Sequence, residues 1–260
     1  MTPDSHLVEE LRPSPNFNAR KGGCGPKILL LHYTGMGTGD QALDWLCNTE
    51  SQVSAHYLVH ENGRVVQLVA EAERAWHAGE GSWRGHDDIN SSSIGIEIVN
   101  GGHAGGLPSY PDEQIEVVVD LCRDIVARNA ILPEFVLAHS DIAPDRKEDP
   151  GEHFPWERLH REDIGHRVEP APLRGGRFFG PGDQGEPVSA FQAMLAAYGY
   201  GVPIDGVFGE VTRLATIAFQ RHFRPARVDG IADISTIETL HRLIGALERS
   251  PFAEKAAAIG

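Results

Sequence analysis

Short apolar runs that lead to a histidine occur twice in the first 140 or so residues of the chain. Residues 28–31 are Ile-Leu-Leu-Leu and are followed by His32, and residues 135–137 are Phe-Val-Leu and are followed, after one alanine, by His139. Runs of this length and hydrophobicity predict buried strands. We therefore expect two strands that each present a histidine at the same edge of a sheet.

A third apolar run, residues 93–99, carries a carboxylate near its centre, at Glu97. Burying a carboxylate in a core strand costs free energy unless the group is paired or used in chemistry. Two interpretations follow. Either the segment is an edge strand whose acid faces solvent, or Glu97 is a functional acid that accepts a proton from a water molecule.

The other patterns predict an α/β fold with a mixed central sheet flanked by helices. Residues 54–60 alternate in strand fashion, and a turn joins them to a second apolar run at residues 65–68. Residues 40–46 predict a short helix, and residues 112–129 predict a long one whose broad apolar stripe covers one face of the sheet. Residues 1–23 are polar and predict an extended arm over this domain.

A change in composition predicts that the chain has two domains. Proline and glycine are dense in residues 171–182, which is typical of a linker. We expect a first domain over residues 1–170, a smaller domain over residues 183–250 and a C-terminal tail over residues 251–260.

The smaller domain contains an internal repeat. Thr212 follows the Asp205-Gly206 pair, and Thr236 follows the Asp229-Gly230 pair at the same offset of seven residues from the aspartate. Asp-Gly pairs favour turns, and threonine favours the first turn of a helix. Together with the apolar pattern of residues 188–198, this spacing predicts a small three-helix domain.

The chemistry near His139 points to a metal. Lys147 and Asp149 follow that histidine by eight and ten residues, and Pro144 disfavours a helix between them. We expect an ordered loop that brings His139 and Asp149 onto one ion. Imidazole nitrogen and carboxylate oxygen both suit zinc, and a catalytic zinc site uses three protein ligands, so His32 is the candidate for the third.

Other residues could contact a substrate near that metal. His56 is the rival ligand, although its place in an alternating strand favours a hydrogen-bonded structural histidine. His77 could contact substrate or simply pack, and the long polar loop over residues 80–92 could line a cleft. The candidate substrate-binding residues are His56, Trp76, His77, Trp83 and Asn90.

Composition excludes some functions. The 260 residues have a formal net charge of −14, which argues against nucleic acid or an anionic membrane as the main partner, because both require a basic face. No apolar run is long enough to span a membrane. The expected state is a monomer.

Cysteine content and the first residues bear on the compartment. Cys24, Cys47 and Cys122 are odd in number and widely spaced, which predicts free thiols in a reducing compartment. The first ten residues lack the pattern of a signal peptide, so we expect a cytoplasmic protein. The periplasm or cell envelope is the alternative if an export signal has been removed.

The first domain resembles a known family, the type 2 (AmpD-like) zinc-dependent N-acetylmuramoyl-L-alanine amidases. The resemblance rests on Leu-His-Tyr-Thr at residues 31–34, Trp-His-Ala-Gly at residues 76–79, and the segments at residues 54–59, 93–97 and 139–156. It implies one zinc ion per chain. It also implies the roles of five residues: the ligands His32, His139 and Asp149, the catalytic acid/base Glu97, and the oxyanion-stabilising Lys147.

The second domain is similar to peptidoglycan-binding domains of type 1, through residues 188–192, 204–209 and 218–220. The two resemblances imply a partner, peptidoglycan or its muropeptide fragments, and a reaction, cleavage of the amide between N-acetylmuramic acid and L-alanine. The alternatives are a peptidoglycan recognition protein without activity and a zinc peptidase acting on the stem peptide. A preference for the 1,6-anhydro sugar stays open.

Overall fold

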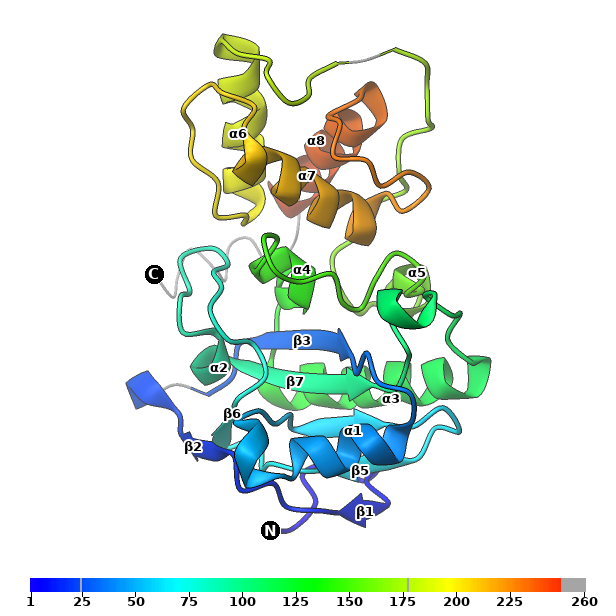
Figure 1. Cartoon of the computed structure of the whole chain (residues 1–260). Helices are drawn as coiled ribbons and strands as arrows, with labels where there is room; N and C mark the ends of the chain where they lie inside the picture. Colours follow the sequence, from blue (N-terminus) through cyan, green and yellow to red (C-terminus); the bar gives the residue numbers. More distant parts are fainter. Residues whose placement is uncertain (24, 177, 249–260) are drawn as a thin grey trace. The chain divides into compact units, whose positions relative to one another are not determined.

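The computed structural model describes residues 1–23, 25–176 and 178–248, and the chain forms two compact units (Figure 1). The first unit consists of Met1–Gly81, His86–His139 and Glu148–Gly165. The second consists of Ser82–Gly85, Ser140–Lys147 and His166–Gly260. Composition predicts two domains that are each continuous in sequence. In the structure, two segments from within the expected first domain, Ser82–Gly85 and Ser140–Lys147, belong to the second unit. The expected tail at residues 251–260 lies outside the described residues.

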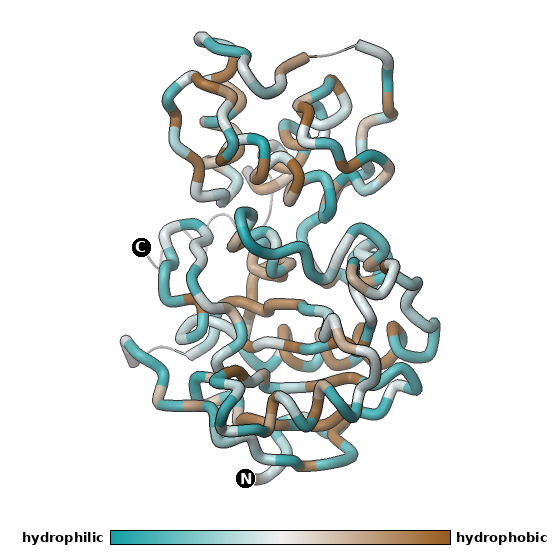
Figure 2. Tube along the Cα trace, in the orientation of Figure 1, coloured by the Kyte–Doolittle hydropathy of each residue, from teal (hydrophilic) through white to brown (hydrophobic). Residues whose placement is uncertain are grey.

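A mixed sheet organises the first unit, as the sequence predicts. In the described residues the sheet has six strands in the order β1 (Glu10–Leu11), β5 (Val65–Gln67), β4 (Tyr57–Val59), β7 (Ser93–Ile98), β3 (Ile28–Tyr33) and β8 (Val136–Ala138). The β4–β5 pair is antiparallel, and the other neighbouring pairs are parallel. The apolar runs that form β3 and β7 therefore lie inside the sheet, and the run that forms β8 lies at its edge. Figure 2 shows a hydrophobic stretch along β3.

Strand register brings the key polar residues onto one face. In β3 and β7, His32 pairs with Glu97, so the two side chains leave the same face of the sheet. Because β7 lies between β4 and β3, Glu97 is not on an edge strand. The solvent-facing edge interpretation of this acid is therefore wrong.

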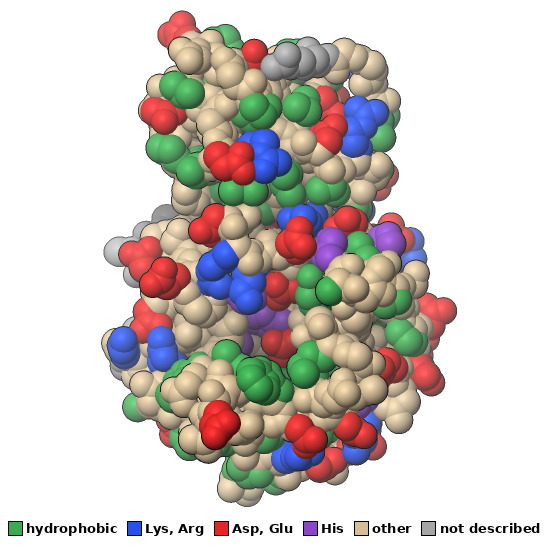
Figure 3. All heavy atoms as spheres, in the orientation of Figure 1, with side chains coloured by type: hydrophobic (Ala, Val, Ile, Leu, Met, Phe, Trp, Pro, Cys, Tyr) green, Lys and Arg blue, Asp and Glu red, His purple; other side chains and the backbone are tan. Residues whose placement is uncertain are grey.

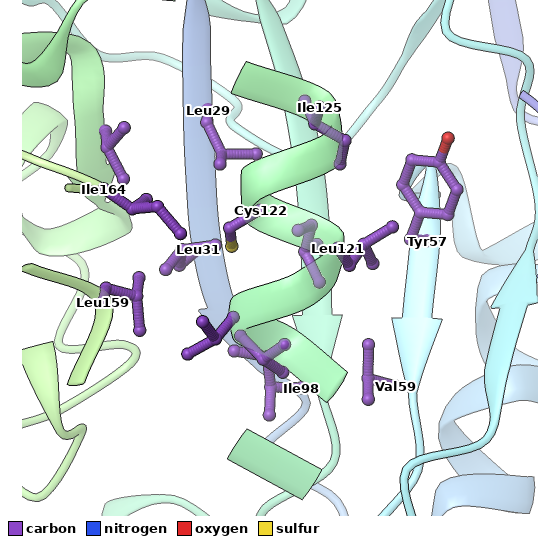
Figure 4. Packing of buried hydrophobic residues seen from close by; sticks show 14 of the residues in the cluster. Leu29, Leu31, Tyr57, Val59, Ile98, Leu121, Cys122, Ile125, Leu159 and Ile164 are labelled. Carbon is purple, nitrogen blue, oxygen red and sulfur yellow. The ribbon is translucent and has the colours of Figure 1, made fainter. Parts of the chain in front are cut away.

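The opposite face is covered by α3 (Asp112–Asn129), whose bounds are those predicted for the long helix. Its buried residues pack on alternate residues of the strands, such as Leu29 and Leu31 of β3 (Figure 4). On the face that carries His32, α1 (Gly39–Leu46) packs Leu43 and Leu46 against Leu58 and Val66. Alternation along β3 thus separates the core residues from the metal-ligand candidate.

The N-terminal segment forms strands instead of a simple arm. Strand β1 pairs with β5, and β2 (Phe17–Ala19) pairs with β6 (Glu73–Ala75) in a separate antiparallel ribbon. The sequence pattern did not predict these strands, because none of their residues is fully buried and the segment is polar in composition. An apolar run is expected only where a strand is buried.

A short helix, α4 (His139–Ile142), begins where the sequence predicted a loop. The prediction of a loop was therefore wrong for the first turn after β8, which is helical. The helix ends at Ile142, since the residue before Pro144 is disfavoured in the helical region. The remaining short helices are α2 (Ile89–Ser92), α5 (Trp156–His160), η1 (Lys21–Gly23), η2 (Thr49–Ser51), η3 (His103–Gly105) and η4 (Pro133–Phe135).

The second unit contains the three predicted helices, α6 (Glu186–Tyr198), α7 (Glu210–Phe223) and α8 (Ile234–Glu248), within the residues described. Their shared core includes Phe191, Leu195, Phe219, Leu240 and Leu243, which are buried. No helix in the described ranges is long and apolar enough to cross a membrane. Cys47 and Cys122 are free thiols, and Cys24 lies outside the described residues.

The repeat is held together by a buried glutamine in each half. Gln220 accepts from the backbone N–H groups of Asp229 and Gly230 and donates to Asp229, Ile231 and Thr236. Gln192 makes the equivalent bonds in the first half, accepting from Gly206 and donating to the Asp205 carboxylate, the Val207 carbonyl and the Thr212 hydroxyl. Each glutamine therefore joins one Asp-Gly turn to the helix that follows it.

This network gives a first prediction. Gln220→Ala leaves the buried turn groups without their partner, so the free energy of unfolding of the second unit should fall by roughly 2 to 4 kcal/mol. Urea unfolding followed by tyrosine fluorescence and circular dichroism measures the change. Val211→Ala, an exposed position on the same helix, is the control and should change stability by less than about 0.5 kcal/mol. Equal stability of the two variants would contradict the role of the glutamine.

Candidate metal centre

Three buried side chains from distant parts of the chain converge in the first unit. His32 lies near the end of β3, His139 directly follows the neighbouring parallel strand β8, and Asp149 lies in the turn region beyond it. The two Nδ1 atoms are 2.8 Å apart, and Asp149 Oδ2 is 2.9 Å from each. The side chains are close to fully buried, and as a group they could hold a metal ion. Figure 3 shows histidine side chains beside acidic ones on the face of the molecule that it draws.

A backbone carbonyl fixes the protonation of His139. Its Nε2 lies 2.9 Å from the carbonyl oxygen of Ala78. A carbonyl oxygen can only accept, so the ring carries its proton on Nε2 and donates it there. When the ring is neutral, its Nδ1 atom is then a lone pair directed at His32 and Asp149.

A longer chain of hydrogen bonds fixes His32 in the same way. The Ser93 hydroxyl donates to the Ile89 carbonyl at 2.6 Å, so its oxygen accepts from His77 Nε2 at 3.2 Å. Burial first, and then the neighbouring histidines, holds the pKa of His77 well below its ordinary value, so this ring is neutral and its Nδ1 is an acceptor. His32 Nε2 donates to that atom at 3.0 Å. In a neutral His32 ring, Nδ1 is therefore also a lone pair.

With both rings neutral, as ligands of a metal must be, the site is a cluster of acceptors with no proton among them. Two imidazole lone pairs and one carboxylate oxygen lie within 2.9 Å of one another, which is repulsive unless a cation lies between them. Neutral imidazole nitrogens together with a carboxylate form a donor set that suits zinc, and three protein ligands leave a coordination position for water or substrate. The residues present therefore fit the metal.

The carboxylate is ionised in this setting. Burial alone would raise the pKa of Asp149, but its position beside His139 and His32 outweighs this and holds the pKa far below its usual range. The ligand set thus has one negative charge, as a divalent cation in a buried site favours.

One dipeptide, His77-Ala78, orients both histidine ligands. His77 supplies the acceptor for His32, and the carbonyl of Ala78 supplies the acceptor for His139. The side-chain oxygen of Asn90 accepts from both backbone N–H groups of this dipeptide, at 3.0 and 2.8 Å.

A glycine in β7 makes room for the same dipeptide. A Cβ added to Gly95 would lie 2.4 Å from His77 Nδ1, so a side chain there would displace the ring that holds His32. A glycine inside a strand often marks such a close approach. Gly95 was therefore the sequence signal that another group packs against β7, although it does not identify that group as His77. Carbonyl acceptors such as that of Ala78 leave no signal in a sequence.

The two other proposed catalytic residues are placed differently. Glu97 lies on β7 beside His32 and is partly buried. Lys147 is half-buried in the segment Ser140–Lys147 of the second unit, and its backbone N–H donates to the carbonyl of Ala143 at 3.1 Å. In the sequence it precedes Asp149 by two residues.

Among the candidate substrate-binding residues, His56, Trp83 and Asn90 are buried and engaged within the protein, as is His77. His56 has no exposed surface, its Nδ1 accepts from the Gly95 N–H at 3.0 Å, and burial followed by the charge of Arg20 lowers its pKa to about 3. Trp83 packs on the rings of Tyr198 and Tyr200 in the second unit. We propose structural roles for these two and for Asn90 in place of contact with substrate.

Trp76 differs from these three. Its ring is partly exposed, and its Nε1–H donates to Asn18 at 2.9 Å. Direct substrate contacts by Trp76 and by His77 stay predictions.

Comparison with known families gives two matches along the chain. Residues 22–152 match the model for N-acetylmuramoyl-L-alanine amidase, and residues 184–240 match the model for a peptidoglycan binding domain. The first match contains His32, Glu97, His139, Lys147 and Asp149.

Individual relatives are similar over most of the chain. N-acetylmuramoyl-L-alanine amidase AmiD of Escherichia coli is 43% identical over 224 residues, which cover 81% of this chain and 79% of that protein. The 1,6-anhydro-N-acetylmuramyl-L-alanine amidase AmpD of Haemophilus influenzae is 36% identical over 163 residues, or 56% of this chain and 86% of that protein.

Two solved structures resemble the whole chain. Escherichia coli AmiD, in complex with the substrate anhydro-N-acetylmuramic acid-L-Ala-D-gamma-Glu-L-Lys, has a TM-score of 0.70 and 37% identity, and the match covers 90% of this chain and 98% of that one. AmpDH3 of Pseudomonas aeruginosa has a TM-score of 0.69 and 30% identity, with 96% and 99% covered.

The support of the ligands by His77 gives a second prediction. Gly95→Ala forces His77 away from His32, and loss of such a supporting hydrogen bond typically weakens metal binding about 10- to 100-fold. Competition with a fluorescent zinc chelator measures the Kd, and circular dichroism monitors the fold. The matched control is Gly105→Ala, because a Cβ there meets no atom within 4 Å. An unchanged Kd in a folded Gly95→Ala variant would show that His77 does not orient the ligand.

Proposed function

The chain belongs to the type 2 N-acetylmuramoyl-L-alanine amidases, and on that premise we propose how its own residues cleave the amide between N-acetylmuramic acid and L-alanine. We propose that His32, His139 and Asp149 bind one zinc ion, that Glu97 is the general acid/base and that Lys147 stabilises the oxyanion. The observation that carries this proposal is the convergence of two Nδ1 atoms and one carboxylate oxygen within 2.9 Å of one another.

Zinc, when bound, supplies a Lewis acid that polarises the scissile carbonyl and makes water more acidic. Glu97 is suited to move the proton because it leaves the same sheet face as His32, on the adjacent strand. Its carboxylate takes a proton from the attacking water and returns it to the nitrogen of the departing L-alanine. The proton balance of the hydrolysis is then complete without another acid.

Lys147 carries a fixed positive charge that compensates the charge developing on the carbonyl oxygen. An ammonium group acts there as a point charge, so its effect falls mainly on the transition state and on kcat. Its position in the sequence, two residues before the ligand Asp149, supports this role.

We propose that the helical part of the second unit binds peptidoglycan. The match of residues 184–240 to a peptidoglycan binding domain supports this role. The relative whose structure contains an anhydro-N-acetylmuramic acid peptide supports the anhydro muropeptide as one substrate of this chain.

Two rivals from other functional classes remain testable. A recognition protein without activity would not need the cluster of His32, His139 and Asp149, whose chemistry suits a metal ion. A zinc peptidase would use the same cluster on the stem peptide, and its products would differ in mass. The cytoplasmic location and the monomeric state stay predictions.

The third prediction concerns the metal and the bond that is cleaved. The purified protein should contain about one zinc ion per chain, lose activity when treated with a chelator and regain it with added zinc. Mass spectrometry of products from defined anhydro and reducing-end muropeptides identifies the bond. The amidase releases the free stem peptide with L-alanine at its N-terminus. Products cut within the stem would support the peptidase, and activity that survives complete removal of metal would refute the zinc role.

The fourth prediction concerns Glu97. Glu97→Gln keeps the shape of the side chain but cannot accept the proton, so kcat should fall about 10²- to 10⁴-fold with zinc content unchanged. Steady-state kinetics and metal analysis on the same preparation provide both values. The matched control is Glu73→Gln, an acid of β6 outside the proposed machinery, which should retain normal kcat. Near-normal turnover of Glu97→Gln would make this residue a structural acid.

A further inference from the structure

One buried carboxylate lies close in sequence to the proposed metal ligands but has no role in the proposed mechanism. Asp141 lies two residues after His139, in the segment Ser140–Lys147 of the second unit, and is 1% exposed. Its Oδ1 accepts from the hydroxyl of Tyr200 at 2.7 Å, and its Oδ2 lies 2.6 Å from Nδ1 of His222. Each oxygen of the carboxylate therefore has one partner from the helical part of the unit.

Both partners are held firmly. Tyr200 is 2% exposed and follows the C-terminal end of α6, where its ring contacts Trp83 and Phe219 edge-on. His222 lies in the last turn of α7, and its ring stacks on Phe223 at 3.8 Å between centroids. A buried carboxylate with two such partners is costly to displace, because movement away from them leaves the charge buried and without those hydrogen bonds.

A second internal segment is held by the same helices. Trp83 has no exposed surface and packs on Tyr198 and Tyr200. Gly199 is needed for this packing, since a Cβ there would lie 2.6 Å from the Trp83 ring. The Ser82 N–H donates to the Ile142 carbonyl at 2.9 Å, which joins the two internal segments to each other.

We propose that Tyr200 and His222 are positioning residues for the amidase reaction. By holding Asp141, the helical part of the second unit fixes the segment Ser140–Lys147. This inference rests on the proposed function, because the segment matters for the reaction only if His139 and Asp149 bind the metal and Lys147 stabilises the oxyanion.

Chain continuity carries the effect to the metal centre. The segment is joined by peptide bonds to His139 at one end and, through Glu148, to Asp149 at the other. It also contains Lys147, whose backbone bond to Ala143 depends on the conformation of the same turn. An anchor at Asp141 restricts the conformations of a loop that carries one catalytic residue between two metal ligands. Misplacing such groups by about 1 Å can cost 10²-fold in rate.

The alternative is that the helices only stabilise the whole protein. In that case any buried tyrosine of the same region should matter equally. Tyr198 provides this comparison, because its hydroxyl pairs with His166 Nδ1 at 2.9 Å and it is buried like Tyr200. Substituting either tyrosine by phenylalanine removes one hydroxyl, but only Tyr200 contacts Asp141.

The experiment compares full-length Tyr200→Phe, Tyr198→Phe, His222→Leu and His222→Asn with the unchanged protein. Asparagine can place an amide N–H near the position of Nδ1, so it is the conservative variant. We expect Tyr200→Phe and His222→Leu to lower kcat on a soluble muropeptide about ten-fold with KM little changed. Tyr198→Phe should keep kcat, and His222→Asn should recover most of it.

A second measurement does not depend on turnover. Hydrogen exchange of the metal-free protein, followed by mass spectrometry, should show faster exchange of the Arg146 and Lys147 amides in Tyr200→Phe than in Tyr198→Phe, by about ten-fold. Equal kcat and equal exchange in the two tyrosine variants would overturn the inference. An unchanged protein that releases no stem peptide would instead overturn the proposed function, while the exchange measurement would still decide whether Asp141 anchors the segment.

Discussion

Mutual repulsion of three acceptors is the constraint on which the site depends. His32 Nδ1, His139 Nδ1 and Asp149 Oδ2 can stay within 2.9 Å only if a cation offsets their negative potential and if the rings cannot turn away. The protein meets the second condition through bonds on the far sides of the rings. The Ala78 carbonyl and the His77–Ser93 chain accept from the two Nε2–H groups, so each lone pair is directed inward before any ion arrives.

The fold and the convergence of His32 and His139 could be predicted because they depend on local patterns. Buried strands read as continuous apolar runs, and parallel neighbours such as β3 and β8 end at one edge of the sheet, so the two histidines were found from the runs that precede them. The long helix α3 has the bounds that its apolar stripe predicts. The strands β1 and β2 were missed because an edge strand with a polar face has no such run.

The groups that orient the ligands could not be predicted, for a different reason. A backbone carbonyl is present at every residue, so the sequence cannot show that the one at Ala78 faces a ligand. The same limit applies to Asp141, which reads as an ordinary polar residue of a loop although it is 1% exposed. Its partners, Tyr200 and His222, come from a part of the chain that composition separates by a linker. Contacts over such sequence distances leave no periodic signal.

The convergence of Nδ1 atoms, in place of Nε2 atoms, has a mechanical consequence. Nδ1 is separated from Cβ by one ring carbon, whereas Nε2 lies at the far side of the ring, so a small rotation about the side-chain torsions moves Nδ1 less. Both histidines extend from the ends of packed strands whose backbones are fixed by the sheet. The two Nδ1 atoms are thereby kept close to the sheet, and His32 leaves the face from which Glu97 also leaves. Asp149 has no strand beneath it and depends on the preceding loop for its position. The histidines therefore need only local support, while the carboxylate ligand needs a loop with an anchor of its own, and Asp141 is the buried group in that loop that supplies one.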